Sequence, residues 1–145
     1  ERNENACAYG LPRHRHLPEI EEQLSAFQGQ KLTLSFQPHL VPINRGICTT
    51  ISAPSADQVK VEDIHACWHA YYGDRAFVKI LENESFPEIK NVVRTNGIDI
   101  AVHHDFRTNR FTLCSAEDNL VKGAGGQAIQ AMNICQGYPE NTGLL

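Results

Sequence analysis

Apolar and polar residues alternate in two stretches of the chain, and this period of two is the strongest constraint on its fold. Alternation places every second side chain on one face of an extended chain, so each stretch predicts a half-buried β-strand. The alternating apolar positions are Leu32, Leu34 and Phe36 in the first stretch, and Ile98, Ile100 and Val102 in the second.

Turn and helix signals surround these stretches. Shorter strands are predicted over 47–51, 77–81, 91–95 and 111–114, with a hairpin turn at 106–110. Helices are predicted over 18–27, 64–71 and 120–135, because Pro18 suits a first helical turn and Gly29 and Gly73 suit helix ends. Strands in series with interspersed helices predict an α+β fold, a mostly antiparallel mixed sheet with helices on one face. The 145 residues suit one domain, 1–145.

Composition excludes several classes of function. The formal net charge is −4, and no cluster of Lys and Arg forms a basic stripe, so nucleic-acid binding is disfavoured. No apolar run approaches the roughly 20 residues that a membrane span requires. The five cysteines are odd in number and lack CxxC spacing, which favours reduced thiols and a cytoplasmic protein. Because the chain begins at Glu1 rather than Met, we expect an excised or processed piece.

The first candidate site precedes the first helix. His14 and His16 are two residues apart, so in an extended segment they share a side, and they lie where free backbone N–H groups attract an anion. Glu19 could orient one imidazole, and a carboxylate-held histidine is a good general base near neutral pH. The alternative is a pair of solvated surface histidines.

Two further segments carry candidate binding residues. Arg45, in a turn, could clamp a carboxylate or phosphate, or could simply be solvated. The glycines of 123–126 do not match a dinucleotide fingerprint or a P-loop, and their spacing favours close packing of a helix. Asn119 stands at the predicted start of that helix and is freer to bind a ligand.

A metal site is not predicted. His65 and His69 have the spacing of metal ligands on a helix, but the pattern lacks the glutamate of a metalloprotease motif. The pair His103 and His104 is weaker, because adjacent residues of a strand point to opposite faces. No cysteine has neighbours that would activate it as a nucleophile.

Three segments together resemble the N-acetyl-gamma-glutamyl-phosphate reductase family, within the semialdehyde dehydrogenase group. They are 14–20 (HRHLPEI), 38–46 (PHLVPINRG) and 118–124 (DNLVKGA), supported in order by 93–97 (VRTNG) and 140–144 (ENTGL). The resemblance implies a fold like the C-terminal domain of glyceraldehyde-3-phosphate dehydrogenase-like enzymes. It also implies a homodimer or homotetramer, and a separate NADP-binding domain absent from this chain.

The resemblance further implies roles for single residues. His14 would be the general base, Glu19 would hold its imidazole, His16 and Arg45 would bind the substrate, and Asn119 would lie near the nicotinamide. The reaction would be NADPH-dependent reduction of N-acetyl-gamma-glutamyl phosphate to the semialdehyde, through a cysteine in a Pro-Gly-Cys context. No Gly-Cys pair occurs here, so this chain alone is expected to be inactive.

Two alternatives stay open. One is reduction of a related, carrier-bound acyl phosphate. The other is a stand-alone assembly module that forms dimers without catalysis.

Overall fold

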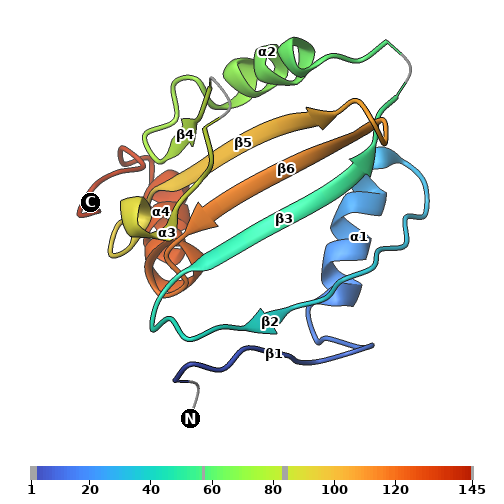
Figure 1. Ribbon diagram of the computed structural model, residues 1–145. Helices are drawn as coiled ribbons and strands as arrows, with labels where there is room; N and C mark the ends of the chain where they lie inside the picture. The colour runs from blue at the N-terminus through green and yellow to red at the C-terminus, as the bar shows by residue number, and fades with distance from the viewer. Residues whose placement is uncertain (1–2, 57, 83–84, 145) are drawn as a thin grey trace. The chain divides into compact units, whose positions relative to one another are not determined.

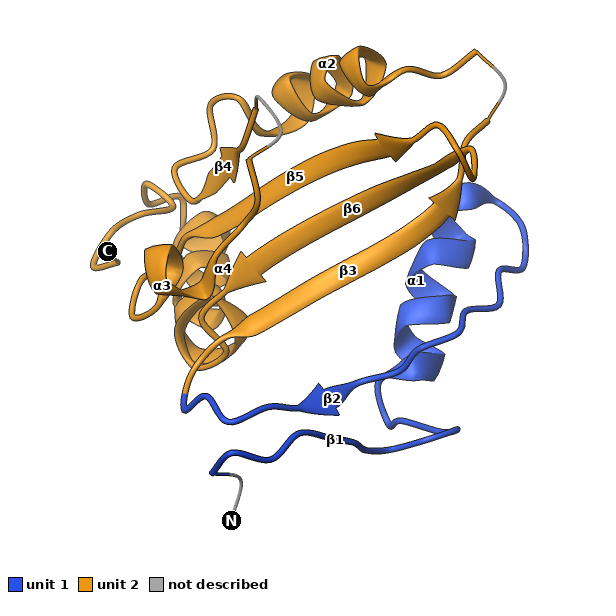
Figure 2. Ribbon diagram, viewed as in Figure 1, with its two compact units in different colours: residues 1–44 blue, residues 45–145 orange. Residues whose placement is uncertain are grey.

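The computed structural model describes residues 3–56, 58–82 and 85–144. They form two compact units, residues 1–44 and residues 45–145 (Figure 2). The first unit holds a short two-stranded sheet and one helix, and the second holds a four-stranded sheet with the remaining helices.

In the first unit, strand β1 (Cys7–Ala8) pairs antiparallel with strand β2 (His39–Leu40). Helix α1 (Leu17–Gln28) has a proline in its first turn and ends at Gly29, whose φ of 75° is left-handed. Proline is pre-set for a first helical turn, and glycine takes a positive φ without steric cost. The predicted helix over 18–27 is confirmed.

The alternating stretch 31–37 forms no β-ladder, so the strand predicted there is wrong. Its alternation is nevertheless real, because Leu32 and Leu34 are half-buried while their polar neighbours are exposed. The Leu32 N–H donates to Ser25 Oγ and the Leu34 N–H donates to Glu21 Oε1, each at 2.8 Å. Side chains of α1 therefore satisfy backbone groups that a neighbouring strand would otherwise bind.

The sheet of the second unit has the strand order β3-β6-β5-β4 (Figure 1). Its strands are β3 (Ile47–Pro54), β4 (Val78–Ile80), β5 (Ile98–Asp105) and β6 (Arg110–Glu117). Strand β6 is antiparallel to both β3 and β5, whereas β4 is parallel to β5. This mixed, mostly antiparallel sheet confirms the predicted α+β class and the predicted β5–β6 hairpin.

Helix α2 (Val61–Tyr72) lies along β4 and β5 (Figure 1), and its predicted existence is confirmed. The strand predicted over 91–95 is wrong, because helix α3 (Ile89–Val92) occupies its start. Arg94 then takes a left-handed φ of 67°. Its N–H donates to Asp118 Oδ2 at 2.6 Å, so this backbone group binds a carboxylate instead of a strand.

The predicted helix over 120–135 is present but begins with a π-helical segment, η1 (Val121–Gly125), before helix α4 (Gly126–Gln136). The Gly123 N–H donates to Asp118 O at 2.8 Å, and the Gly125 N–H donates to Leu120 O at 3.1 Å. Each bond spans five residues, which widens the turn relative to an α-helix.

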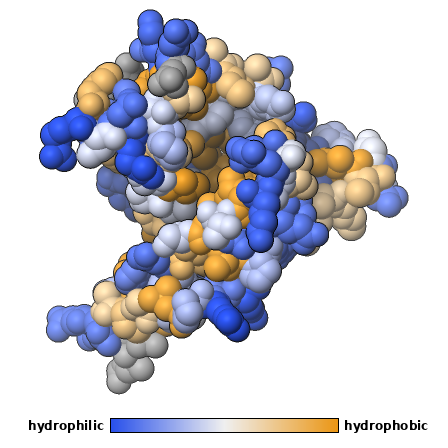
Figure 3. All heavy atoms as spheres, turned by 90° about the vertical axis from the view of Figure 1, so that its right-hand side faces the viewer, coloured by the Kyte–Doolittle hydropathy of each residue, from blue (hydrophilic) through white to orange (hydrophobic). Residues whose placement is uncertain are grey.

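The hydrophobic core of the second unit is small. It centres on buried Phe77, Val102 and Phe111, while many large apolar side chains stay exposed. Apolar atoms accordingly reach the surface among polar ones on the face shown in Figure 3. Within the described ranges, no helix has the length and apolar character needed to cross a membrane.

Candidate functional site

His14 is held by aromatic rings just before α1. The rings of Tyr9, His16 and Phe36 lie edge-on to it, with centroids 5.2–5.3 Å away. Edge-to-face contacts fix the plane of a ring as well as its position. His14 is consequently half-buried and oriented, whereas His16 is exposed.

The backbone further restricts this imidazole. The His16 N–H donates to His14 Nδ1 at 3.3 Å, so the neutral ring carries its proton on Nε2. Gly10 has a φ of 66°, and a Cβ built on it would lie 2.7 Å from His14 Cδ2. Gly10 therefore allows both the left-handed turn and the close approach of the ring.

The predicted partner Glu19 lies in the first turn of α1 and is exposed. Among the hydrogen bonds of the described residues, none joins Glu19 to His14. The structure places His14 and His16 together, and the role of Glu19 stays a prediction.

Sequence reasoning missed the groups that hold His14, namely Tyr9, Gly10 and Phe36. Gly10 offered a signal, because a glycine shortly before Pro12 indicates a turn. Phe36 gave none, because its alternating pattern indicated only a buried face.

In the second unit, Arg45 is engaged by Asp118. Arg45 Nη2 lies 3.0 Å from Asp118 Oδ1 and 2.9 Å from Oδ2. The aspartate side chain is 0% exposed and that of Arg45 is 30% exposed. Arg45 Nε is buried without a partner, so the guanidinium keeps donors that Asp118 does not satisfy.

Asp118 is the most tightly hydrogen-bonded side chain of this region. It accepts the N–H groups of Arg94, Leu120 and Val121 in addition to the Arg45 bond. Burial by itself raises the pKa of Asp118, but Arg45 and these three N–H groups together outweigh burial. The pKa therefore lies far below the usual aspartate range, and Asp118 stays charged.

Asn119 makes a second contact beside this ion pair. Its Oδ1 accepts the Gly46 N–H at 2.8 Å, so residues 45–46 are bound to residues 118–119 by two side chains. The register of β3 with β6 explains these two contacts, because Ile47 pairs with Glu117 at the adjacent position. The structure thus brings Arg45 and Asn119 close together, while their roles toward substrate and cofactor stay predictions.

Lys122 lies in the π-helical segment and takes part in a polar network. Its Nζ donates to Gln130 Oε1 at 2.9 Å, and buried Asn96 donates to the same oxygen at 2.9 Å. Burial lowers the pKa of Lys122, and the nearby carboxylates of Glu117 and Glu140 oppose that shift. The network links the π-helical segment and the middle of α4 to Asn96, two residues before β5.

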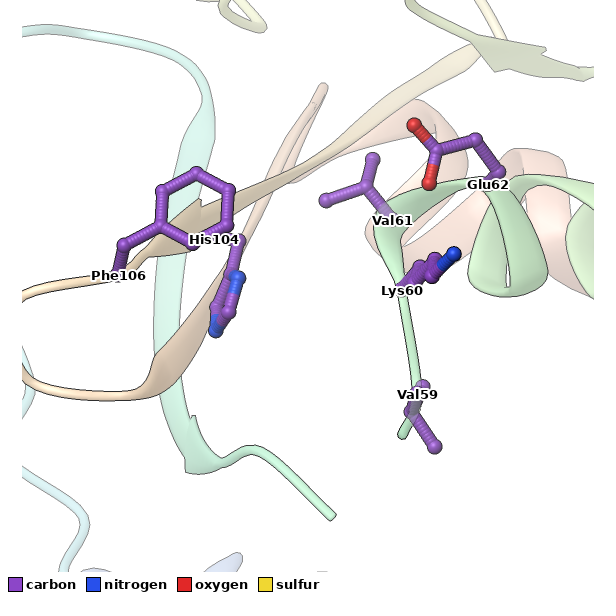
Figure 4. A pocket seen from close by; sticks show the side chains of 6 residues that line it. All are labelled: Val59, Lys60, Val61, Glu62, His104 and Phe106. Atoms are coloured by element: carbon purple, nitrogen blue, oxygen red, sulfur yellow. The ribbon is translucent and has the colours of Figure 1, made fainter. Parts of the chain in front are cut away.

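A shallow hollow of about 250 Å³ lies between the start of α2 and the end of β5 (Figure 4). His104 and Phe106 face Val61 there, with Val59, Lys60 and Glu62 at its edge. Its volume is below the roughly 300–1,000 Å³ of ligand pockets. We therefore assign it no role.

The second unit is of the α+β class with a mixed sheet, and the first unit holds an oriented histidine ahead of a helix. The family described as semialdehyde dehydrogenase, dimerisation domain, matches residues 1–119. The chain belongs to this family.

Relatives agree with that assignment. The chain is 48% identical over 142 residues to N-acetyl-gamma-glutamyl-phosphate reductase of Akkermansia muciniphila, which covers 98% of this chain and 41% of that protein. It is 47% identical over 143 residues to the reductase of the same name from Geotalea daltonii, again 98% of this chain and 41% of that protein. The chain therefore spans about two-fifths of the length of these relatives.

Solved structures show the same fold at low identity. Aspartate semialdehyde dehydrogenase from Francisella tularensis aligns with a TM-score of 0.69 and 17% identity, over 92% of this chain and 40% of that one. Aspartate semialdehyde dehydrogenase II from Vibrio cholerae gives 0.66 and 15%, over 86% and 38%. The predicted fold class is confirmed by both.

Proposed function

We propose that this chain is the catalytic and dimerisation portion of an NADPH-dependent reductase. The complete protein would convert N-acetyl-gamma-glutamyl phosphate to N-acetylglutamate semialdehyde in arginine biosynthesis, in the cytoplasm. The observation that carries the proposal is the identity of nearly half of all residues with reductases of that name, across 98% of this chain. Because the chain spans about 41% of their length, the proposal concerns an activity to which it contributes.

His14 is the proposed acid–base group. Its aromatic neighbours fix the ring, and its Nδ1 accepts the His16 N–H, which leaves Nε2 to face a reacting atom. In this tautomer Nε2 donates a proton. Taking one at Nε2, as a general base must, requires the ring to release the His16 N–H and carry its proton on Nδ1. Glu19 is proposed to stabilise that second form.

The substrate's carboxylate or phosphate is proposed to bind His16 and Arg45. His16 is the N-cap residue of α1, at the positive end of the helix dipole, which favours an anion. Arg45 shares its guanidinium with Asp118 but retains unsatisfied donors, and a third of its side chain is exposed. Asp118 would thus hold Arg45 in place for a second anion.

NADP is the proposed cofactor, bound mainly by a separate NADP-binding domain, and its reduced form, NADPH, would supply the hydride. Asn119 is the residue of this chain proposed to contact it. The fit is reasonable, because Gly46 occupies only the Asn119 oxygen and the amide N–H₂ remains available to a carboxamide oxygen. The exposed apolar side chains of the second unit support a homodimer or homotetramer.

The test uses the complete native protein, with reduction of N-acetyl-gamma-glutamyl phosphate followed by NADPH absorbance. We expect His14→Ala to lower kcat by roughly 10²–10⁴-fold, because a positioned general acid or base contributes that much. His104→Gln is the matched control, since His104 lies outside every proposed site, and its rate should stay within about twofold of wild type.

Three results would count against the proposal. An His14→Ala rate within about twofold of wild type would remove His14 from the mechanism. Faster turnover of a carrier-bound acyl phosphate than of the free N-acetylated one would reassign the substrate. A complete native protein that dimerises but turns over neither compound would favour the assembly module.

A further inference from the structure

Three side chains with metal-binding atoms meet on the surface of the second unit. His65 and His69 come from α2, and Glu82 comes from the segment after β4. One ligand atom from each residue lies within 4.8 Å of the corresponding atoms of the other two. The histidine spacing alone lacked a carboxylate, and the fold supplies it from 13 residues further along the chain.

The three ligand atoms are near enough to one another to share one tetrahedral ion. Metal–ligand distances of about 2.0–2.2 Å for imidazole nitrogen and carboxylate oxygen place ligand atoms about 3.3–3.6 Å apart around the ion. His69 Nε2 and Glu82 Oε1 are already 3.0 Å apart. The remaining atoms need to approach by about 1 Å, which rotation of partly exposed side chains can provide.

The backbone holds both sides of this cluster. His65 and His69 are one turn apart on a 12-residue helix, so they share a face. On the other side, the Leu81 N–H donates to Ile100 O at 2.8 Å, immediately before Glu82. The His65 ring also lies near Trp68, at 6.2 Å between centroids, and is half-buried. The backbone positions of the three residues are therefore set before an ion binds.

We propose that His65, His69 and Glu82 bind a divalent transition-metal ion of the zinc class, with water as the fourth ligand. Two imidazoles and one carboxylate form a donor set that zinc accepts in proteins. The ion would link α2 to the segment after β4 and so fasten the helix along this edge of the sheet. The proposal is independent of the reductase activity, since it involves none of the residues assigned to that reaction.

The experiment measures Zn²⁺ binding to the complete native protein by competition with a chromophoric chelator. We expect His69→Ala and Glu82→Gln each to weaken the binding of one Zn²⁺ by about 100-fold or more, since outer-sphere changes alone cost about 10–100-fold. The matched controls are His39→Gln and Glu22→Gln, which remove the same chemical groups elsewhere and should bind Zn²⁺ as wild type does.

A second measurement identifies the ligands without relying on variants. Titration of the wild-type protein with Cu²⁺ should broaden the imidazole NMR signals of His65 and His69 before those of His39 and His104. Simultaneous broadening of all four would overturn the proposal. So would equal Zn²⁺ affinity of wild type and His69→Ala, or a cobalt–thiolate absorption band that disappears in Cys67→Ser, because Cys67 is exposed on the same helix.

Discussion

Asp118 shows how one buried side chain can organise several segments. It binds a guanidinium and three backbone N–H groups, and its side chain has no exposed surface. A buried carboxylate is costly unless its acceptors are filled, and here five polar contacts fill them. Removal of its charge therefore affects the β3 start, the turn at Arg94 and the π-helical segment together.

At the residue scale we predict that Asp118→Asn lowers the free energy of unfolding by about 3–5 kcal/mol at neutral pH, because Arg45 and the N–H groups lose a charged partner. Urea denaturation of the complete protein measures this. The control is Glu88→Gln, which removes an exposed carboxylate paired with Lys90 and should cost no more than about 1 kcal/mol. Equal losses in the two variants would contradict the assignment.

The same residue predicts a pH dependence. The folded-state pKa of Asp118 lies below the unfolded-state value, so the unfolded chain binds more protons in acid. Its contribution is complete above the usual aspartate range and is lost as the pH falls through that range towards the depressed pKa. The difference between wild type and Asp118→Asn should accordingly shrink between about pH 5 and pH 2. A difference that grows in acid would refute the depressed pKa.

At the scale of elements, two adjacent glycines at the start of α4 differ in the space that surrounds them. A Cβ on Gly126 would overlap Asn96 Oδ1 and approach Val121 O at 2.8 Å. A Cβ on Gly125 would meet only Leu120 O, at an ordinary 3.6 Å. Both residues have helical φ and ψ angles, so local conformation does not distinguish them.

We predict opposite effects for the two alanine variants. Gly126→Ala should destabilise by about 1–3 kcal/mol through overpacking. Gly125→Ala should be neutral or stabilise by up to about 1 kcal/mol, because alanine is the better helix former. Thermal unfolding measures both, and a stabilising Gly126→Ala would show that Asn96 moves aside without cost.

The elements also show what a sequence can predict. Helix α1 followed from Pro18 and Gly29, which are local signals, and the hairpin of β5 with β6 followed from a turn between two apolar runs. Alternation over 31–37 predicted the buried face but not the pairing, because Ser25 and Glu21 replace a strand. The turn at Arg94 depends on Asp118, which lies 24 residues away in the sequence.

The candidate sites divide in the same way. The sequence located His14 and His16 because adjacent polar motifs are visible without a fold. It could not locate Phe36 beside His14 or Glu82 beside His69, because those contacts depend on tertiary structure.

At the scale of the whole molecule, large apolar side chains of the described residues are more often exposed than buried. Exposed examples on β3 and α4 are Ile47, Ile51, Ile129 and Met132. Such surface marks contact with other protein, and it agrees with membership of a dimerisation-domain family.

Amide hydrogen exchange of the complete protein should separate amides that are bonded within the four-stranded sheet from amides that are bonded only to side chains. Strands β5 and β6 have neighbours on both sides, so their amides should exchange slowest. The amides of Leu32 and Leu34 bind only side chains of α1 and should exchange faster by orders of magnitude. Mass spectrometry of peptides over 32–36 and 111–116 measures the difference, and equal protection would mean that 31–37 is stabilised by further contacts.

The π-helical segment has a consequence for how this chain tolerates changes in length. Successive residues of an α-helix are rotated by about 100° about its axis. One inserted or deleted residue therefore rotates all later residues of the helix by that angle. The wide turn at Val121–Gly125 has the form that a single inserted residue takes within a helix. It sets the rotation at which both Gly126 and Gln130 meet Asn96. Shortening the segment by one residue would restore a regular helix and turn both contacts away from their partners.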